Sequence, residues 1–246
     1  MEGKRNKLIT GLLLLLLSVR IFADNRTEIY SAYINNRMEN WKNVIDRMEA
    51  SGSKNNEFLL ELINYQYGYI GYCLGFEKEK DAQKYLLAAE KNISVLEKTG
   101  YKLPLLHAYR SAFYGFRISI SKLSAPVNGP RSLNNAKKST ELDNKNYFGY
   151  VQMGNAYFYM PQAFGGSKKI AFQNFNKARN LMEKDLSLTK GNWNYLSLLV
   201  TIAQSHTYLE EYEKAKAEYE NIMKLEPGFL YVKNDLYPEL LKKMKN

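Results

Sequence analysis

Two histidines, one cysteine and one glycine-rich turn are the parts of this sequence that could carry chemistry. His107 and His206 belong to no H-E-x-x-H, G-x-S-x-G or metal-loop spacing, and His206 falls at a helical core position. Cys73 has no second cysteine to pair with and no nearby histidine to activate it, so we interpret it as a buried apolar residue. The sequence therefore predicts no catalytic residue, no metal ligand and no cofactor, and we expect the protein not to be an enzyme.

The turn from Gly165 to Lys169 places two glycines before a helical segment, an arrangement in which backbone amides can bind phosphate. The G-x-x-x-x-G-K-[ST] spacing is absent, however, and no strand pattern precedes the turn. We interpret the segment as a wide turn instead. Pro161 ends one helix, the glycines permit positive φ, and Ser167 caps the helix that follows.

The elements that must position these residues all show helical periodicity, and none shows the sustained two-residue alternation of a strand. Between Ser197 and Pro227 the apolar residues form two helical faces on either side of one short turn. The first face consists of Leu199, Ile202, Ala203 and His206, and the second of Ala215, Tyr219 and Ile222. The pattern predicts an all-α chain built from helical hairpins.

This hairpin resembles the tetratricopeptide repeat, a pair of helices spanning about 34 residues. Six of its residues match the repeat pattern, namely Leu199, Ile202, Ala203, Ala215, Tyr219 and Pro227, whereas His206 and Ile222 depart from it. The preceding hairpin matches at Tyr150, Met153, Gly154, Tyr157, Ala171, Phe175 and Ala178. The resemblance implies an α–α superhelix whose best repeats cover about 147–183 and 196–229.

Five predicted helical segments precede these repeats, one at the N-terminus and then two pairs. Residues 26–48 are predicted to form one helix, or two helices abutting at 34–37. Residues 57–74 and 81–96 are predicted to pair, and three glycines in the first of them, Gly68, Gly71 and Gly75, indicate close helix approach. Residues 104–123 and 131–142 are predicted to pair across an enlarged, non-helical turn at 124–130, because this turn is rich in proline.

Residues 1–23 have the composition of a secretory signal peptide, with Lys4, Arg5 and Lys7 before an apolar run from Leu8 to Leu17. The run is shorter than the roughly 20 apolar residues that cross a bilayer, which favours cleavage after Ala23 over a retained anchor. We therefore expect a periplasmic or secreted protein with no stable membrane insertion. Residues 24–246 are expected to form a single domain of helical repeats.

The charge pattern argues against a nucleic-acid partner. The chain has 35 Lys and Arg, 25 Asp and Glu and a net charge of +10. In segments such as 77–84 and 210–220 the two signs are interleaved, as on solvated helix faces, and they form no basic stripe.

The resemblance implies a concave surface lined by the first helix of each hairpin, which suits a protein or peptide partner. The candidate groove residues share these first-helix positions: Phe148, Val151, Asn155, Phe158, Tyr159, Val200, Gln204, Thr207 and Tyr208. The alternative is capture of a small apolar or glycan-like ligand, as in periplasmic repeat proteins that assist a transporter. The aromatic residues in 65–72 and 109–116 suggest this alternative, but aromatics at helical spacing can equally belong to a core.

Overall fold

The computed structural model describes residues 24–52 and 54–245, so the expected signal peptide lies outside the described residues. Every regular element within these two ranges is a helix, which confirms the all-α prediction. Helical residues 24–34 come first and are followed by α2 (Met38–Glu49), α3 (Asn56–Gly75), α4 (Glu79–Lys98), α5 (Leu103–Ile120), α6 (Ala125–Leu142), α7 (Tyr147–Tyr159), α8 (Lys168–Met182), α9 (Leu186–Thr189), α10 (Trp193–Tyr208), α11 (Tyr212–Leu225) and α12 (Tyr237–Lys243). Short helical turns occur at Lys122–Ser124, Gln162–Phe164 and Val232–Leu236. None of the described helices combines the length and the apolar character needed to cross a membrane.

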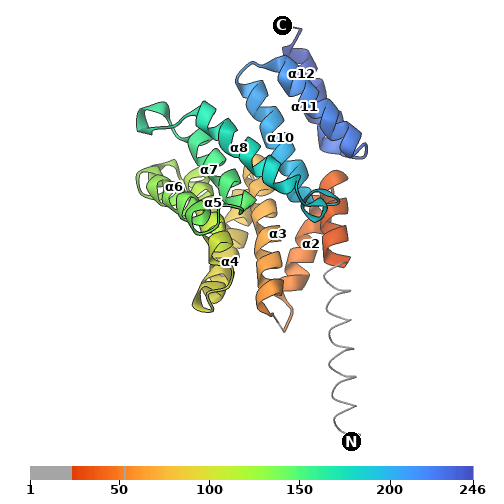
Figure 1. Cartoon of the computed structure of the whole chain (residues 1–246). Coiled ribbons are helices and arrows are strands. Elements are labelled where there is room, and N and C mark those ends of the chain that lie inside the picture. The colour runs from red at the N-terminus through yellow and green to blue at the C-terminus, as the bar shows by residue number, and fades with distance from the viewer. Residues whose placement is uncertain (1–23, 53, 246) are drawn as a thin grey trace, which may run out of the picture.

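Consecutive helices pack as hairpins: α3 with α4, α5 with α6, α7 with α8 and α10 with α11. Each hairpin also contacts the next, since α5 touches both α3 and α7, and α10 touches α8. Figure 1 shows the hairpins following one another along the chain. This arrangement is the predicted α–α superhelix. The break between residues 34 and 38 also confirms the second of the two expectations for the N-terminal segment, two abutting helices.

The helix from Ala125 to Leu142 corrects one prediction, because residues 124–130 were expected to be a non-helical turn. In the structure the connection ends with the short helical turn Lys122–Ser124, and α6 begins at the next residue, Ala125. Pro126 fits the first helical turn, where the amide would have no intrahelical acceptor. Pro130 removes one backbone hydrogen bond inside the helix, yet the helix continues, because its buried stripe of Asn128, Ser132, Ala136 and Ser139 packs against its neighbours.

Small residues set the distances between helices at particular positions. A Cβ on Gly154 would overlap the ring of the fully buried Phe175, and a Cβ on Gly68 would lie 2.6 Å from Trp41 and 2.7 Å from Trp193. The prediction of close approach is therefore confirmed for Gly68. It is wrong for Gly75, where an added Cβ would have no neighbour within 4 Å. At Gly71 an added Cβ would only be in van der Waals range of Phe116.

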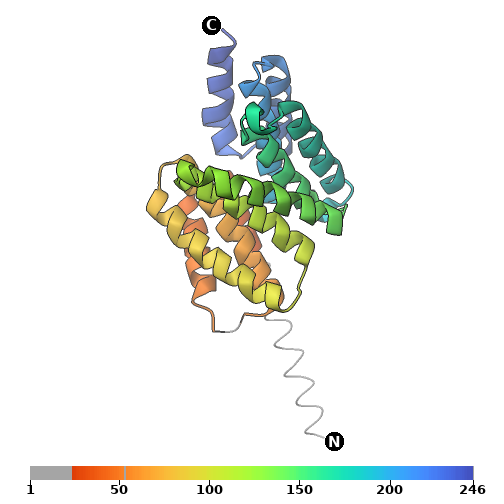
Figure 2. The same cartoon turned by 90° about the vertical axis from the view of Figure 1, so that its left-hand side faces the viewer.

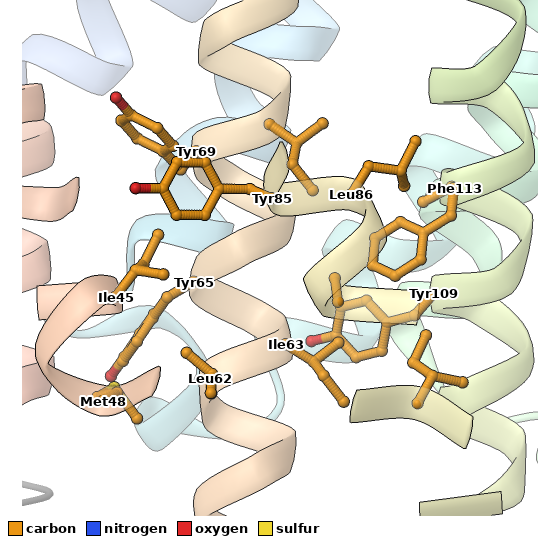
Figure 3. Close-up of a cluster of buried hydrophobic side chains, with 14 of the residues drawn as sticks. Ile45, Met48, Leu62, Ile63, Tyr65, Tyr69, Tyr85, Leu86, Tyr109 and Phe113 are labelled. Carbon is orange, nitrogen blue, oxygen red and sulfur yellow. The ribbon is translucent and has the colours of Figure 1, made fainter. Parts of the chain in front are cut away.

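Buried side chains form two clusters, one centred on α2 to α5 and one on α8 to α12. Figure 3 shows part of the first cluster, in which Tyr65, Tyr69, Tyr85 and Tyr109 lie among aliphatic side chains. Four of the eight aromatics in 65–72 and 109–116 are buried in the core, and three more, Tyr67, Tyr72 and Phe116, are half-buried and pack against it.

The N-terminal helical residues pack against the C-terminal end of the chain. The Tyr30 hydroxyl donates a hydrogen bond of 2.7 Å to Glu226 Oε2, and the Tyr33 ring lies 4.9 Å from that of Phe229. Figures 1 and 2 both place this helix beside the C-terminal helices. The first helical residues of the described chain therefore pack against the segment that follows α11.

Candidate functional site

The residues that could carry chemistry all have structural partners. His107 Nδ1 lies 2.9 Å from Asn135 Oδ1, and the His206 ring packs on Phe172 and lies 2.6 Å from a Glu211 oxygen. Cys73 is fully buried, and burial raises the pKa of its thiol to about 11, which disfavours the reactive thiolate at neutral pH. Within the described ranges, no cluster of His, Cys, Asp and Glu could hold a metal ion.

The glycine-rich turn has the predicted geometry at Gly165 and at the Ser167 cap but not at Gly166, which has no positive φ; an added Cβ on Gly166 would lie 1.8 Å from the Met160 carbonyl oxygen. Gly165 has a φ of +93°, and the Ser167 side chain accepts the Ile170 amide at 3.3 Å as an N-cap. Lys168 points back into the protein, where its Nζ donates to the Phe158 carbonyl oxygen and lies 3.7 Å from the Phe158 ring centroid and 4.5 Å from that of Tyr208. This amine is therefore part of an aromatic contact between α7 and α10, and burial lowers its pKa.

Six of the predicted groove residues form two rows along α7 and α10, each with a spacing of four residues. Both rows start at a valine and end at an exposed tyrosine; they are Val151, Asn155 and Tyr159 on α7, and Val200, Gln204 and Tyr208 on α10. Tyr159 is 78% exposed and Tyr208 is 66% exposed. The Phe158 ring lies between them, 5.3 Å from each. We call Asn155, Phe158, Tyr159, Gln204 and Tyr208 the α7–α10 face.

Of the predicted groove residues, the structure buries Phe148, Phe158 and Val200 and half-buries Thr207. Phe148 is 4% exposed and packs 4.7 Å from Tyr109, and Val200 is 7% exposed, so the structure places both in the core. Thr207 is half-buried and uses its hydroxyl on the Ala203 carbonyl at 3.1 Å. Periodicity correctly identified one side of each helix, but not which parts of that side a neighbouring helix covers. Phe158 itself is buried beneath Lys168 and serves as the base of the face.

The sequence does not reveal that residues of α3, α7 and α10 meet in one cluster, made of Tyr67, Gln152 and Trp193. Gln152 Nε2 donates to the Tyr67 hydroxyl at 3.4 Å, and burial together with the nearby Tyr159 phenol raises the pKa of Tyr67. Trp193 lies 6.2 Å from Tyr67, and its buried indole N–H has no hydrogen-bond acceptor among the described residues. Tyr67 belongs to an aromatic segment that the sequence identifies, but only the fold reveals that Gln152 and Trp193 join it.

Two hollows in the described surface lie away from the α7–α10 face. One of about 560 Å³ is lined by Glu77 to Asp81 and Gln83 at the α3–α4 turn. The other, of about 270 Å³, lies between α4, α5 and α6 and is lined in part by Leu87, Arg117 and Ile120.

The buried phenols predict a loss of stability in alkali. Burial raises the pKa of Tyr147 to about 12 from its ordinary value of 10.0, and also raises the pKa of Tyr33, Tyr67 and Tyr109. A raised folded-state pKa stabilises the fold below pH 10, and this contribution is lost as the pH rises through the folded value. Between pH 9 and pH 11 the free energy of unfolding, measured by denaturant titration, should fall by about 1.4 kcal/mol less for Tyr147→Phe than for the unmodified chain. Equal losses would show that Tyr147 ionises normally in the folded protein.

Comparison with known proteins extends the fold description. No family model and no curated protein matches the sequence. The structure is similar to that of the HusA haemophore from Porphyromonas gingivalis, with a TM-score of 0.56, 15% identity and coverage of 79% of this chain and 93% of that one. It is also similar to a thermophilic TPR protein from Thermus thermophilus, with a TM-score of 0.53, 15% identity and coverage of 93% and 97%. The chain is thus a TPR-like helical-repeat protein.

Proposed function

We propose that this chain is an exported, non-enzymatic helical-repeat scaffold that binds a protein or peptide partner at the α7–α10 face. The N-terminal sequence supports export, and the helical-repeat fold supports a binding role, because stacked hairpins offer extended surfaces to partners.

The assignment of the face rests on one observation. The first helices of two adjacent hairpins, α7 and α10, each have an exposed tyrosine one turn after a side-chain amide. Tyr159 and Tyr208 are both more than half exposed, and the Phe158 ring lies between them and carries the Lys168 amine above it. Gln204, one helical turn before Tyr208, is exposed and offers donors and an acceptor to a peptide backbone. Asn155, one turn before Tyr159, is half-buried and donates from Nδ2 to Gln152 Oε1 at 3.3 Å, so mainly its side-chain oxygen is left for a partner. Exposed tyrosines that bury their rings on binding are typical interface anchors.

Alanine substitutions at this face are expected to weaken binding without altering the fold. Against a peptide selected for binding to the chain from Asp24 onward, Tyr159→Ala and Tyr208→Ala should each cost about 2 kcal/mol, or about 30-fold in Kd. Asn155→Ala and Gln204→Ala should cost about 1 kcal/mol each. Fluorescence anisotropy measures the affinity, and circular dichroism checks the helix content. Leu186→Ala is the matched control, because Leu186 is 80% exposed on α9, outside the face.

A second candidate function is capture of a small apolar ligand. The unpartnered Trp193 N–H and the buried phenols of Tyr67 and Tyr147 support it, and one structural neighbour is by its title a haemophore. The only two tryptophans of the chain, Trp41 and Trp193, lie 4.9 Å apart, and Trp193 lies 6.2 Å from Tyr67, so their fluorescence would report such a ligand. Saturable quenching of their fluorescence by haem, together with peptide affinities that the tyrosine substitutions leave unchanged, would favour this function over the first.

A further inference from the structure

The α5–α6 hairpin has an excess of basic side chains, unlike the segments in which basic and acidic residues alternate. Residues 98–140 contain no Asp or Glu and eight basic residues: Lys98, Lys102, Arg110, Arg117, Lys122, Arg131, Lys137 and Lys138. Two of these are neutralised by α4, since Arg110 pairs with Glu97 at 2.7 Å and Arg117 with Glu90 at 2.6 Å. The others form no ion pair with any described residue.

The unpaired charges of α6 lie on its solvent face. Arg131, Lys137 and Lys138 are all exposed, and Val127, Arg131 and Lys138 follow one another at intervals of four and seven residues. The opposite stripe of the helix is buried. Figure 2 shows α6, in green, running across the front of the molecule with no other helix over it.

Exposed apolar side chains lie at the N-terminal end of the same helix. Leu123 is 94% exposed, Val127 is 56% exposed, and Leu87 of α4 is 65% exposed. Leu87 lines the 270 Å³ hollow together with Ile120 and Ser124, and the exposed Leu123 directly precedes Ser124 in sequence. We call Leu87, Leu123, Val127, Arg131, Lys137 and Lys138 the α5–α6 face.

We propose that the α5–α6 face binds the surface of a membrane that contains anionic phospholipids. Lys and Arg beside a membrane are attracted to anionic headgroups, while exposed leucines gain free energy by entering the acyl boundary. A nucleic acid would satisfy the charges but would offer no apolar layer to Leu123, which is 94% exposed. The lipid surface is the partner that matches both parts of the face, and it requires no membrane-spanning helix.

The test is co-sedimentation of the chain from Asp24 onward, which contains both described core clusters, with vesicles of phosphatidylcholine alone or with phosphatidylglycerol added. We expect binding only to the anionic vesicles, and weaker binding when the salt is raised. Lys137→Gln with Lys138→Gln should weaken binding about 25-fold, and Leu123→Ser about tenfold. The matched controls, Lys224→Gln with Lys233→Gln and Leu186→Ser, also change exposed residues and should bind as the unmodified chain does.

Two results would overturn the proposal. One is equal binding to both vesicle types. The other is binding to anionic vesicles that Leu123→Ser leaves unchanged and that a soluble oligonucleotide abolishes, because the face would then recognise a polyanion rather than a lipid surface. Neither result affects the α7–α10 face, which uses different helices.

Discussion

Replacing Trp193 with alanine is expected to lower the free energy of unfolding by about 4 kcal/mol. Trp193 is 5% exposed at the start of α10, and its ring packs 4.9 Å from that of Trp41 and 5.9 Å from that of Tyr33. Gly68 of α3 also packs against the Trp193 ring, since an added Cβ there would lie 2.7 Å from it. The substitution therefore leaves a cavity where the N-terminal helices meet α10. Urea denaturation followed by circular dichroism measures the effect.

Phenylalanine substitutions separate packing from hydrogen bonding at this site. Trp41 Nε1 donates to the Tyr65 carbonyl oxygen at 2.9 Å, whereas the Trp193 N–H has no such acceptor among the described residues. Trp41→Phe should thus cost about 1 kcal/mol more than Trp193→Phe. A Trp193→Ala chain that unfolds at the same urea concentration as the unmodified chain would show that α10 does not depend on this contact.

Replacing Gly154 with alanine is expected to cost about 3 kcal/mol, although alanine normally favours a helix. The added Cβ would overlap the ring of Phe175, which is fully buried between α7 and α8 and cannot move aside without disturbing the second core cluster. Thermal or urea unfolding of the variant provides the measurement.

Gly115→Ala is the matched control, because Gly115 lies in α5 with no neighbour within 4 Å of an added Cβ. It should stabilise the chain by about 0.5–1 kcal/mol. Combining Gly154→Ala with Phe175→Leu should destabilise the protein less than the sum of the two single changes, because the smaller side chain makes room for the Cβ. Additive effects would contradict a direct contact between residues 154 and 175.

Much of the fold could be predicted because its determinants are local. The periods of Ala203, Ala215 and Tyr219 identified the last hairpin, and the pairing of Gly154 with Phe175 explains why the preceding hairpin matches the repeat pattern so closely. The Ser167 cap and the Gly165 conformation also depend only on neighbouring residues. Pro130 misled the prediction, since tertiary packing of α6 outweighed one lost hydrogen bond.

The candidate site was predicted less well, because it depends on contacts between distant segments. Periodicity selected Phe148 and Val200 together with Tyr159 and Tyr208, yet only the packing of α5 against α7 and of α10 against its neighbours separates the buried pair from the exposed pair. The basic segment 98–140 was readable in the sequence but was hidden when charges were averaged over the whole chain.

The contact between the N-terminal helix and the C-terminal end alters how this solenoid must fold. In an open array each repeat touches only its neighbours, so that terminal repeats can fray and folding can begin anywhere. Here the hydrogen bond from Tyr30 to Glu226 joins residues 196 positions apart, and Tyr33 and Trp193 add packing across the same junction. Closing so long a loop is entropically costly and slows folding, but once closed it couples the two ends into one cooperative unit. A terminal hairpin can then open only by breaking the contacts of this junction as well as those with its neighbour.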